Sequence, residues 1–357
     1  MNKPTPENAK IHALHGLRGV MAWWVVLGHV SLTFGWQIPL IDRNALAVEV
    51  FVLLSGFVIA MLIDRKVEPY GKYIVRRAFR VFPLYLVILF ISAALLPVQI
   101  GAWNSLQGSP LNLNRLTLAL DGWEYLGGHM LAHVPLLQGL IPTAISSQAP
   151  YTIVGQAWSV SLEWQFYLVA PYLVWALAKL PRTPLALSAI ALLLGLSHWF
   201  AGAFLGAKII HFAIGMVTYK IIRRGEIQFW MSGLSLLVAA AVVKNGAMQF
   251  IPLGVWLSVV WSASRPSHSC GHLIARWLGS APLFRMGEIS YSVYLVHMIP
   301  LYTLIYLLRA SSLPTEIMQA IVLLGTVGIT LALAVITFRY VEKPGIALGA
   351  RLTSYKR

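Results

Sequence analysis

Long apolar segments recur along this chain, and they constrain its fold more than any other feature. A helix needs roughly 20 apolar residues to cross the hydrocarbon core of a bilayer. About ten segments reach or approach that length, at residues 16–36, 44–63, 79–97, 157–178, 184–206, 208–222, 229–243, 247–262, 289–309 and 316–338. Hydrophobic residues make up 58% of the sequence and charged residues only 11%, unlike a soluble domain. The sequence therefore predicts an all-α, polytopic helical membrane protein with about ten transmembrane helices.

The basic residues are distributed asymmetrically between the loops. With the N-terminus inside, 21 of the 27 lysines and arginines fall on the cytoplasmic side and five on the opposite side, while Lys220 lies within a span. Cytoplasmic loops are expected to collect Lys and Arg, so this layout indicates an even number of spans with both termini cytoplasmic. The net charge of +15 lies between apolar spans rather than on a soluble basic surface, which argues against a nucleic-acid partner.

The two ends of the chain flank a single membrane domain. A polar stretch at 1–10 precedes the first apolar segment, and no small-residue cleavage site follows it, as in an uncleaved signal anchor. We expect a cytoplasmic segment at 1–10, a membrane domain at 11–345 and a basic cytoplasmic tail at 346–357. The single cysteine, Cys270, excludes an intramolecular disulfide.

Residues 98–156 form the only long connection between the apolar segments. A span there would move Lys179 and Arg182 to the outside, against the charge asymmetry. We therefore predict an extracytoplasmic loop, with room for a re-entrant or interfacial helix in its moderately apolar part, 126–141.

The stretch LHGLRGVMAWWVVLGHV places two ionisable residues in the first apolar segment. His29 follows Arg18 by eleven positions, with ten residues between them, so a helix puts the two within about 20° of one face and roughly 16 Å apart along its axis. Arg18 can be a positive-inside anchor and His29 a residue that bonds a neighbouring helix. Ionisable groups at membrane depth are also functional candidates, and spacing alone leaves both interpretations open.

Only two acids, Glu49 and Glu163, lie clearly within the predicted spans. Glu49 requires a proton or a partner at that depth, and His29 is a plausible one. In the same segment, Ser55 and Gly56 are small residues that favour close helix packing.

The stretch AWSVSLEWQFYLVAP opens a span from the outside. Ser159, Glu163 and Tyr167 follow each other at intervals of four residues, so a helix presents them on one face, with Glu163 roughly 9 Å in. Lipid contact or packing explains such a polar stripe poorly, so we interpret it as functional.

Three arginines gather where the third span begins, in YIVRRAFRVFPLY. Arg76 and Arg80 share a helical face, with Arg77 beside them. Paired guanidinium groups suit phosphates because their forks make bidentate contacts. The alternative is a stop-transfer cluster that binds anionic lipid.

Two later stretches carry further polar residues. MGEISYSVYLVHMIP contains hydroxyl groups and an imidazole, at Ser290, Tyr291, Tyr294 and His297. His297 is expected about three turns in from the cytoplasmic side, and the tyrosines also fit an interfacial belt. In RYVEKPG, Pro344 and Gly345 are expected to end the last helix.

No metal site is predicted. His129 and His133 lie four residues apart in the long loop, and HSCGH offers His268, Cys270 and His272, but neither set is complete. We expect solvated loop histidines instead. A phosphate-binding Gly-rich loop, a nucleophile elbow and a dinucleotide fingerprint are all missing from the sequence.

In their order and content these stretches resemble the acyltransferase 3 family, bacterial membrane-bound O-acyltransferases that decorate extracytoplasmic glycans with acetyl or other short acyl groups. The resemblance covers residues 11 to 345. It lies in GLRGVMAWWVVLGH at 16–29, VEVFVLLSGF at 48–57, RRAFRVFPLY at 76–85, AWSVSLEWQFYLVAP at 157–171, ISYSVYLVH at 289–297 and YVEKP at 340–344.

The resemblance implies a location in the bacterial cytoplasmic (inner) membrane and a catalytic histidine in an Arg-x10-His motif, here Arg18 and His29. It also implies that acyl-CoA, in the simplest case acetyl-CoA, is the donor. The residues expected near this donor are the arginines Arg76, Arg77 and Arg80. Many relatives carry Asp where Glu49 stands, and the extracytoplasmic hydrolase-like domain of some members is not found in this chain.

Acyl transfer to a hydroxyl needs a base for its proton and donors for the developing oxyanion. We expect His29 to be the base, with Glu163 or Glu49 holding its tautomer. The candidates for contacts with substrate or oxyanion are Glu49, Ser159, Tyr167, Tyr291 and His297.

Other interpretations stay open from the sequence. A non-catalytic transporter or flippase could use His29, Glu49 and Glu163 as a proton relay, although inverted repeats and paired broken helices are not evident. The same enzyme class could act on a small molecule or a lipid. Trp103, Trp123 and Trp158 could stack on sugars or sit in the interfacial belt, and the sequence does not give the oligomeric state.

Overall fold

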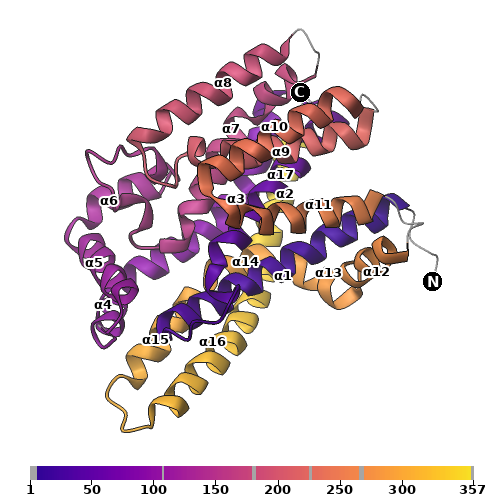
Figure 1. Cartoon of the computed structure of the whole chain (residues 1–357). Coiled ribbons are helices and arrows are strands. Elements are labelled where there is room, and N and C mark those ends of the chain that lie inside the picture. Colours follow the sequence, from indigo (N-terminus) through magenta and orange to yellow (C-terminus); the bar gives the residue numbers. More distant parts are fainter. Residues whose placement is uncertain (1–5, 107, 179–181, 225–226, 265–268, 355–357) are drawn as a thin grey trace.

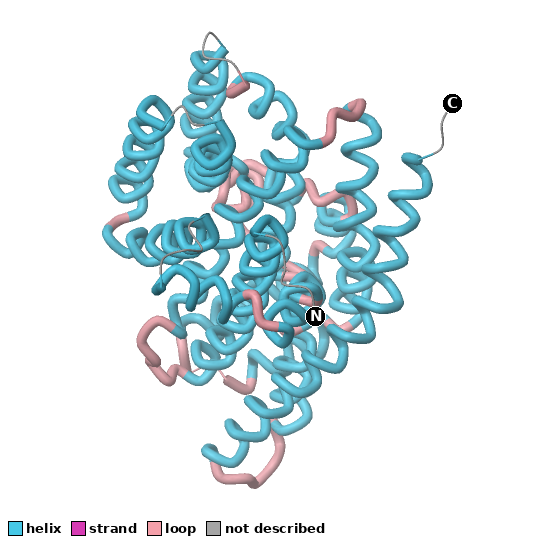
Figure 2. The backbone as a smooth tube through the Cα atoms, turned by 90° about the vertical axis from the view of Figure 1, so that its right-hand side faces the viewer, coloured by secondary structure: helices cyan, strands magenta, loops and turns pink. Residues whose placement is uncertain are grey.

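The computed structural model describes residues 6–106, 108–178, 182–224, 227–264 and 269–354, and these residues fold almost entirely into helices (Figure 1). Within these ranges the only β-type pairing is an isolated bridge between Pro142 and Phe200. The tube in Figure 2 shows the same all-helical arrangement from the side, with short loops between the helices. The all-α part of the predicted fold class is confirmed.

Each predicted apolar segment coincides with one helix or with a pair of helices. They are α1 (Pro6–Phe34), α2 (Asn44–Arg65), α3 (Tyr70–Ala94), α7 (Trp158–Ala176), α8 (Thr183–Leu196), α9 (Leu205–Arg224), α10 (Ile227–Asn245), α11 (Phe250–Ser264), the pair α14 (Ser290–Val296) and α15 (Met298–Leu308), and α16 (Thr315–Thr337). In Figure 1, α15 and α16 extend together as a hairpin at the bottom of the view.

Among the described residues, five helical stretches are long and apolar enough to cross a membrane, at 12–34, 41–65, 205–223, 290–308 and 315–354. A sixth arises if α3 and α4 (Leu96–Asn104), which meet at a 61° bend, count as one span. Several helices can thus cross a bilayer, as expected of a multi-pass membrane protein. The count of ten spans and the cytoplasmic position of both termini stay predictions.

The long connection is mostly helical rather than irregular. It contains α4, α5 (Pro110–Glu124) and α6 (Leu126–His133), followed by three short 3-10 turns. The prediction of solvated histidines here is wrong, because both are buried. His129 contacts Asp121 at 2.9 Å, and the His133 carbonyl accepts a hydrogen bond from Tyr85 of α3. The first contact joins α6 to α5 within the connection, and the second ties the connection to α3.

The expected helix stop at Pro344 and Gly345 is also wrong. A short π-helix, Phe338–Glu342, leads directly into α17 (Lys343–Ser354), so part of the predicted tail is a helix. Pro344 is the second residue of α17, directly after the π-helix, and the helix continues through it. A Cβ atom at Gly345 would lie 2.7 Å from the Pro83 ring, so this glycine lets α17 pack closely on α3.

Two short helices complete the fold, α12 (Ser269–Leu278) and α13 (Ala281–Glu288), both of which contact α1. The predicted spans at 247–262 and 289–309 leave this region as a connection between helices. Both are too short to span a bilayer, which explains why a search for long apolar segments misses them.

The core lies where α2 crosses α9, and two glycines allow this close approach. A Cβ atom at Gly56 would lie 2.3 Å from the Phe212 carbonyl oxygen, and one at Gly215 would lie 2.1 Å from the Leu53 carbonyl oxygen. Each glycine therefore faces the backbone of the opposite helix. The predicted role of Gly56 in helix packing is confirmed.

We expect Gly56→Ala to reduce stability by about 1–3 kcal/mol, because the new methyl group must push the two backbones apart. The measurement is the thermal unfolding midpoint in detergent. Gly254→Ala is the matched control, since a Cβ atom there meets open space and Ala favours the helix by about 1 kcal/mol. Equal midpoints for Gly56→Ala and the original chain would contradict the close crossing.

Candidate active site

The stripe of α1 that carries Arg18 and His29 opens onto two different cavities. Arg18 lines one of them and His29 lines the other. Because α1 is continuous from Pro6 to Phe34, the predicted spacing of roughly 16 Å along its axis holds. The two residues therefore belong to two sites joined by one helix.

The first cavity, called here the arginine cavity, has a volume of about 120 Å³. Its walls come from α1, α2, α3, α7, α9 and α14, five of them predicted spans of the sequence and the sixth part of another. Its polar lining residues are Arg18, Ser55, Arg77, Arg80, Ser159, Glu163, Tyr167, Ser290, Tyr291 and Tyr294. The predicted polar face of α7, with Ser159, Glu163 and Tyr167, does line one cavity.

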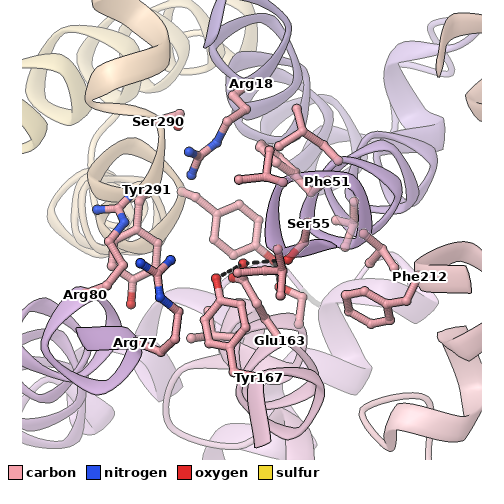
Figure 3. A pocket seen from close by; sticks show the side chains of 18 residues that line it. Arg18, Phe51, Ser55, Arg77, Arg80, Glu163, Tyr167, Phe212, Ser290 and Tyr291 are labelled. Atoms are coloured by element: carbon pink, nitrogen blue, oxygen red, sulfur yellow. Dashed lines mark hydrogen bonds between the residues drawn. The ribbon is translucent and has the colours of Figure 1, made fainter. Parts of the chain in front are cut away.

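Three guanidinium groups enter the arginine cavity from two helices (Figure 3). The Arg77 guanidinium lies 5.9 Å from the centre of the Tyr167 ring, and that of Arg80 lies 5.3 Å from the centre of the Tyr291 ring. The Nε atoms of Arg18 and Arg77 are buried and have no hydrogen-bond partner among the described residues. Buried donors without partners are costly, so this end of the cavity is suited to an anionic ligand.

Glu163 supplies negative charge at another wall of the same cavity. Its carboxylate accepts hydrogen bonds from the Tyr167 hydroxyl and from Ser55 Oγ, the latter at 3.1 Å. Ser55 therefore has a polar contact in the cavity and is not only a small packing residue.

Arg80 is held by an acid that the sequence analysis did not select. Glu342, at the end of the π-helix, is buried and forms an ion pair with Arg80. Its other oxygen accepts a hydrogen bond from Ser292 Oγ at 2.6 Å. The sequence did contain a signal for this residue, because Glu342 is the acid of YVEKP at the end of an apolar segment. π-turns often occur at functional sites, and this one directs Glu342 inward.

The three predicted donor-binding arginines do not act as one group. Arg77 and Arg80 line the arginine cavity, whereas the Arg76 side chain turns away from it. Arg76 Nε donates to Thr353 Oγ1 at 2.6 Å, and its Nη1 lies 2.9 Å from Glu68 Oε2. Arg76 therefore contacts α17, whereas Arg77 and Arg80 join Arg18 in the cavity.

The second cavity, called here the histidine cavity, has a volume of about 550 Å³. Most residues around it come from α1, α4, α5, α15 and the turns that precede α7, and α2, α3 and α7 contribute one residue each. Its polar and aromatic lining includes His29, Gln99, Trp103, Asn114, Arg115, Gln148, Tyr151, Gln156, Trp158 and Tyr302. Two of the three tryptophans proposed to contact sugars, Trp103 and Trp158, line it, whereas Trp123 is exposed elsewhere.

His29 has an imidazole partner, His297, in place of the expected carboxylate. His29 Nδ1 lies 2.9 Å from His297 Nε2, and the two rings stack with their centres 5.0 Å apart. His297 stands at the break between α14 and α15, where Pro300 cannot donate a hydrogen bond to the carbonyl of Val296. This break between the two helices places the His297 imidazole beside α1.

Hydrogen bonding fixes the tautomers of this pair. His297 Nδ1 lies 2.7 Å from the Tyr294 carbonyl oxygen, which can only accept, so this nitrogen carries the proton. When His297 is neutral, its Nε2 must accept, and His29 Nδ1 must donate to it. His29 Nε2 then keeps a free lone pair, and His29 lines the histidine cavity. This is the tautomer that a general base requires.

A thin wall separates the two cavities. Ser159 and Tyr294 line the arginine cavity, and Gln156 lines the histidine cavity. The Tyr294 hydroxyl lies 2.7 Å from Ser159 Oγ and donates to the Gln156 carbonyl oxygen at 2.8 Å. Since His297 bonds the carbonyl of Tyr294, the wall connects both sites directly.

The expectation that Glu49 partners His29 is wrong. Glu49 Oε1 accepts a hydrogen bond from Lys208 Nζ at 2.5 Å, and its other oxygen lies 3.9 Å from His211 Nε2. The close crossing of α2 and α9 turns Glu49 toward α9, which explains the pairing. The carboxylate of Glu163 is likewise bonded within its own cavity, so the described hydrogen bonds form no relay through His29, Glu49 and Glu163.

The predicted hydroxyl of Tyr291 is also engaged. It donates to the Val81 carbonyl oxygen at 2.8 Å, and Tyr167 donates to Glu163. Of the three predicted hydroxyl donors, Ser159 alone lies in the wall between the cavities, next to Tyr294.

No group of three or more potential metal ligands occurs among the residues that the structure describes. The side chains of the HSCGH stretch, with its two histidines and its cysteine, lie outside the part that the structure describes.

Comparison with known proteins identifies a family to which this chain is similar. Residues 11–339 match the family model for an acyltransferase domain, acyltransferase 3. The chain is 26% identical to a protein of Komagataeibacter xylinus named "Putative membrane-bound transacylase BcsY", over 96% of this chain and 84% of that protein. It is 25% identical to "Acyltransferase MdmB" of Streptomyces mycarofaciens, over 82% of this chain and 79% of that protein. No solved structure matches.

The family model covers most of the chain, and both relatives are named for acyl transfer. The matched range contains every residue that lines the two cavities, and Glu342, which pairs with Arg80, lies just beyond it. This multi-pass membrane protein therefore belongs to the acyltransferase 3 family and is an acyltransferase.

Proposed function

We propose that this chain is a bacterial inner-membrane O-acyltransferase that moves an acyl group from cytoplasmic acyl-CoA to a hydroxyl of an extracytoplasmic glycan. The observation that carries the proposal is the pair of cavities on one stripe of α1. One is lined by arginines and the other by a histidine with aromatic and amide side chains, and a single wall joins them.

The donor would bind by its phosphates in the arginine cavity. Three guanidinium groups with two unpartnered Nε atoms suit a diphosphate. One water molecule needs about 10–15 Å³ of cavity volume, so a cavity of about 120 Å³ has room for several water-sized groups, such as those of a diphosphate. The nucleoside of acyl-CoA would therefore lie outside it, and the thioester arm would point along α1 toward His29.

The acceptor would bind in the histidine cavity. Its amide side chains can donate and accept hydrogen bonds, and its aromatic rings offer apolar faces, which are the contacts that sugars require. Its volume of about 550 Å³ lies in the usual range of small-molecule sites.

In the transfer step, His29 Nε2 takes the proton of the acceptor hydroxyl as its oxygen attacks the thioester carbonyl. The tetrahedral intermediate collapses, the C–S bond breaks, and the departing thiolate receives the proton from the imidazolium. The products are the glycan ester and free CoA. His297 accepts the His29 Nδ1–H bond and would stabilise the imidazolium. The Tyr294 hydroxyl already donates to the Gln156 carbonyl oxygen, so the Ser159 hydroxyl, once it turns away from Tyr294, would be the donor to the oxyanion.

The experiment uses the purified chain in nanodiscs with acetyl-CoA radiolabelled in the acetyl group and a panel of glycans. We expect label in the glycan fraction, released by hydroxylamine as an ester, and stoichiometric free CoA. Empty nanodiscs control for chemical transfer. Label that appears in lipid or in small molecules but never in a glycan would contradict the acceptor class, and CoA release without any ester would contradict O-acyl transfer.

A further inference from the structure

The histidine cavity contains one cation that the proposed reaction does not use, Arg115 of α5. Its guanidinium lies 4.8 Å from the centre of the Trp103 ring. Its Nη1 donates to Thr33 Oγ1 at 2.6 Å and to Asn112 Oδ1 at 3.3 Å. All of these partners are neutral.

Within the described part of the chain, no aspartate or glutamate forms an ion pair with Arg115 or lines the histidine cavity. Burial lowers the pKa of Arg115 to about 10, and no acid offsets this effect. The side chain is still charged at neutral pH. A half-buried charge without a counterion is unfavourable, because its desolvation is not repaid.

Thr33 fixes the position of this charge relative to the proposed base. Thr33 Oγ1 accepts the Arg115 bond and donates to the His29 carbonyl oxygen at 2.6 Å. Residues 29 and 33 are one helical turn apart, roughly 6 Å along the axis of α1. An anionic group held by Arg115 would therefore lie about one turn from the hydroxyl that His29 activates, a separation that a single sugar ring or two adjacent rings can span.

The hydrogen bonds of Arg115 leave donors available. The guanidinium has five N–H groups, and the two contacts above use only Nη1. The planar fork suits a carboxylate or a phosphate, each of which accepts two parallel bonds. The remaining lining of amides and aromatic rings suits the neutral part of a sugar.

We propose that the acceptor is an anionic glycan, and that Arg115 binds a carboxylate or phosphate group of the sugar that receives the acyl group. This inference deepens the proposed function. It makes Arg115 the residue that selects acidic over neutral acceptors, and it leaves the transfer chemistry to His29.

The test measures binding, so that it does not depend on acyl transfer. The purified full chain in nanodiscs is titrated with methyl glycosides of glucose, galactose and mannose, each as the neutral sugar, the uronic acid and the 6-phosphate. Intrinsic tryptophan fluorescence reports occupancy, because Trp103 and Trp158 line the cavity. We expect at least one acidic series to bind about tenfold more tightly than its neutral counterpart, with the preference declining as salt rises.

Arg115→Gln should reduce this acidic-to-neutral affinity ratio to about one, because the charged hydrogen bond to the anionic group is lost. Arg115→Lys should keep part of the ratio, because it keeps the charge without the fork. Arg309→Gln removes an exposed arginine at the far end of α15 and should leave the ratio unchanged. The ratio is robust to partial misfolding, which lowers the active fraction for all sugars alike.

The uronic acid and 6-phosphate arms identify which anion is recognised. Equal binding of acidic and neutral sugars by the original chain, or an unchanged ratio in Arg115→Gln, would overturn the proposal. Should Arg115→Gln instead slow transfer equally to neutral and acidic acceptors while the binding ratio persists, Arg115 would serve the oxyanion and the proposal would fail. A chain that prefers acidic sugars but transfers no acyl group would refute the proposed function and not this inference.

Discussion

Replacing His29 by Gln is expected to lower the rate of acyl transfer by roughly 10³-fold, the middle of the range for a general base. Gln keeps a side-chain amide that can donate to His297 Nε2, but it offers no basic lone pair to an acceptor hydroxyl. The donor cavity lies on the other side of the wall, so the affinity for acetyl-CoA should stay within about twofold of the original value, well under one kcal/mol. Single-turnover transfer and equilibrium donor binding separate the two effects.

The matched control for this variant is His198→Gln. His198 is exposed in a short 3-10 turn between α8 and α9, away from both cavities. It should transfer acyl groups at the original rate. Full activity in a folded His29→Gln sample would exclude His29 as the base and leave the His29–His297 pair with a packing role.

Arg77→Gln is expected to weaken acetyl-CoA binding by about 10- to 100-fold, because a hydrogen bond to a charged group contributes about 1.5–3 kcal/mol. Its Nε is buried without a partner in the arginine cavity, so a bound phosphate would supply the acceptor that the protein lacks. The effect should appear in KM and in equilibrium binding, and it should diminish at high salt. Isothermal titration with acetyl-CoA measures it directly.

The comparison variant is Arg76→Gln on the same helix. Arg76 contacts Thr353 and Glu68 instead of the cavity, so its removal should change donor affinity far less than removal of Arg77. Equal losses in the two variants would mean that the donor engages the whole arginine cluster, as the sequence alone suggested. A weaker loss in Arg77→Gln would contradict the assignment of the cavity.

The helices of this fold are readable from the sequence because lipid leaves so few choices. An apolar segment of about 20 residues in lipid must be helical so that its backbone N–H and C=O groups are hydrogen-bonded. Each of the ten predicted segments accordingly coincides with one helix or a pair of helices. The short helices of the long connection and α12 and α13 lack that length, and tertiary contacts such as those of His133 stabilise them. The local sequence pattern does not predict such tertiary contacts.

The candidate site shows the same contrast between features within one helix, which the sequence predicts, and contacts between helices, which it does not. Periodicity within one helix correctly placed Ser159, Glu163 and Tyr167 on one face and Arg18 with His29 on one stripe. Which residue meets which across the bundle depends on how helices cross and where they break. The His297 partner depends on a break in a predicted single helix, Glu49 was turned away by a glycine-mediated crossing, and Glu342 was brought in by a π-turn.

In the proposed reaction, the donor reaches His29 from the arginine cavity, and the acceptor reaches it from the histidine cavity. The most direct test is a structure of the chain in nanodiscs with a thioether analogue of acetyl-CoA. We expect the diphosphate to lie among Arg18, Arg77 and Arg80, with the acyl carbon beyond the wall of Ser159 and Tyr294 and facing His29 Nε2. A diphosphate in the histidine cavity, or an acyl group that ends away from His29, would contradict it.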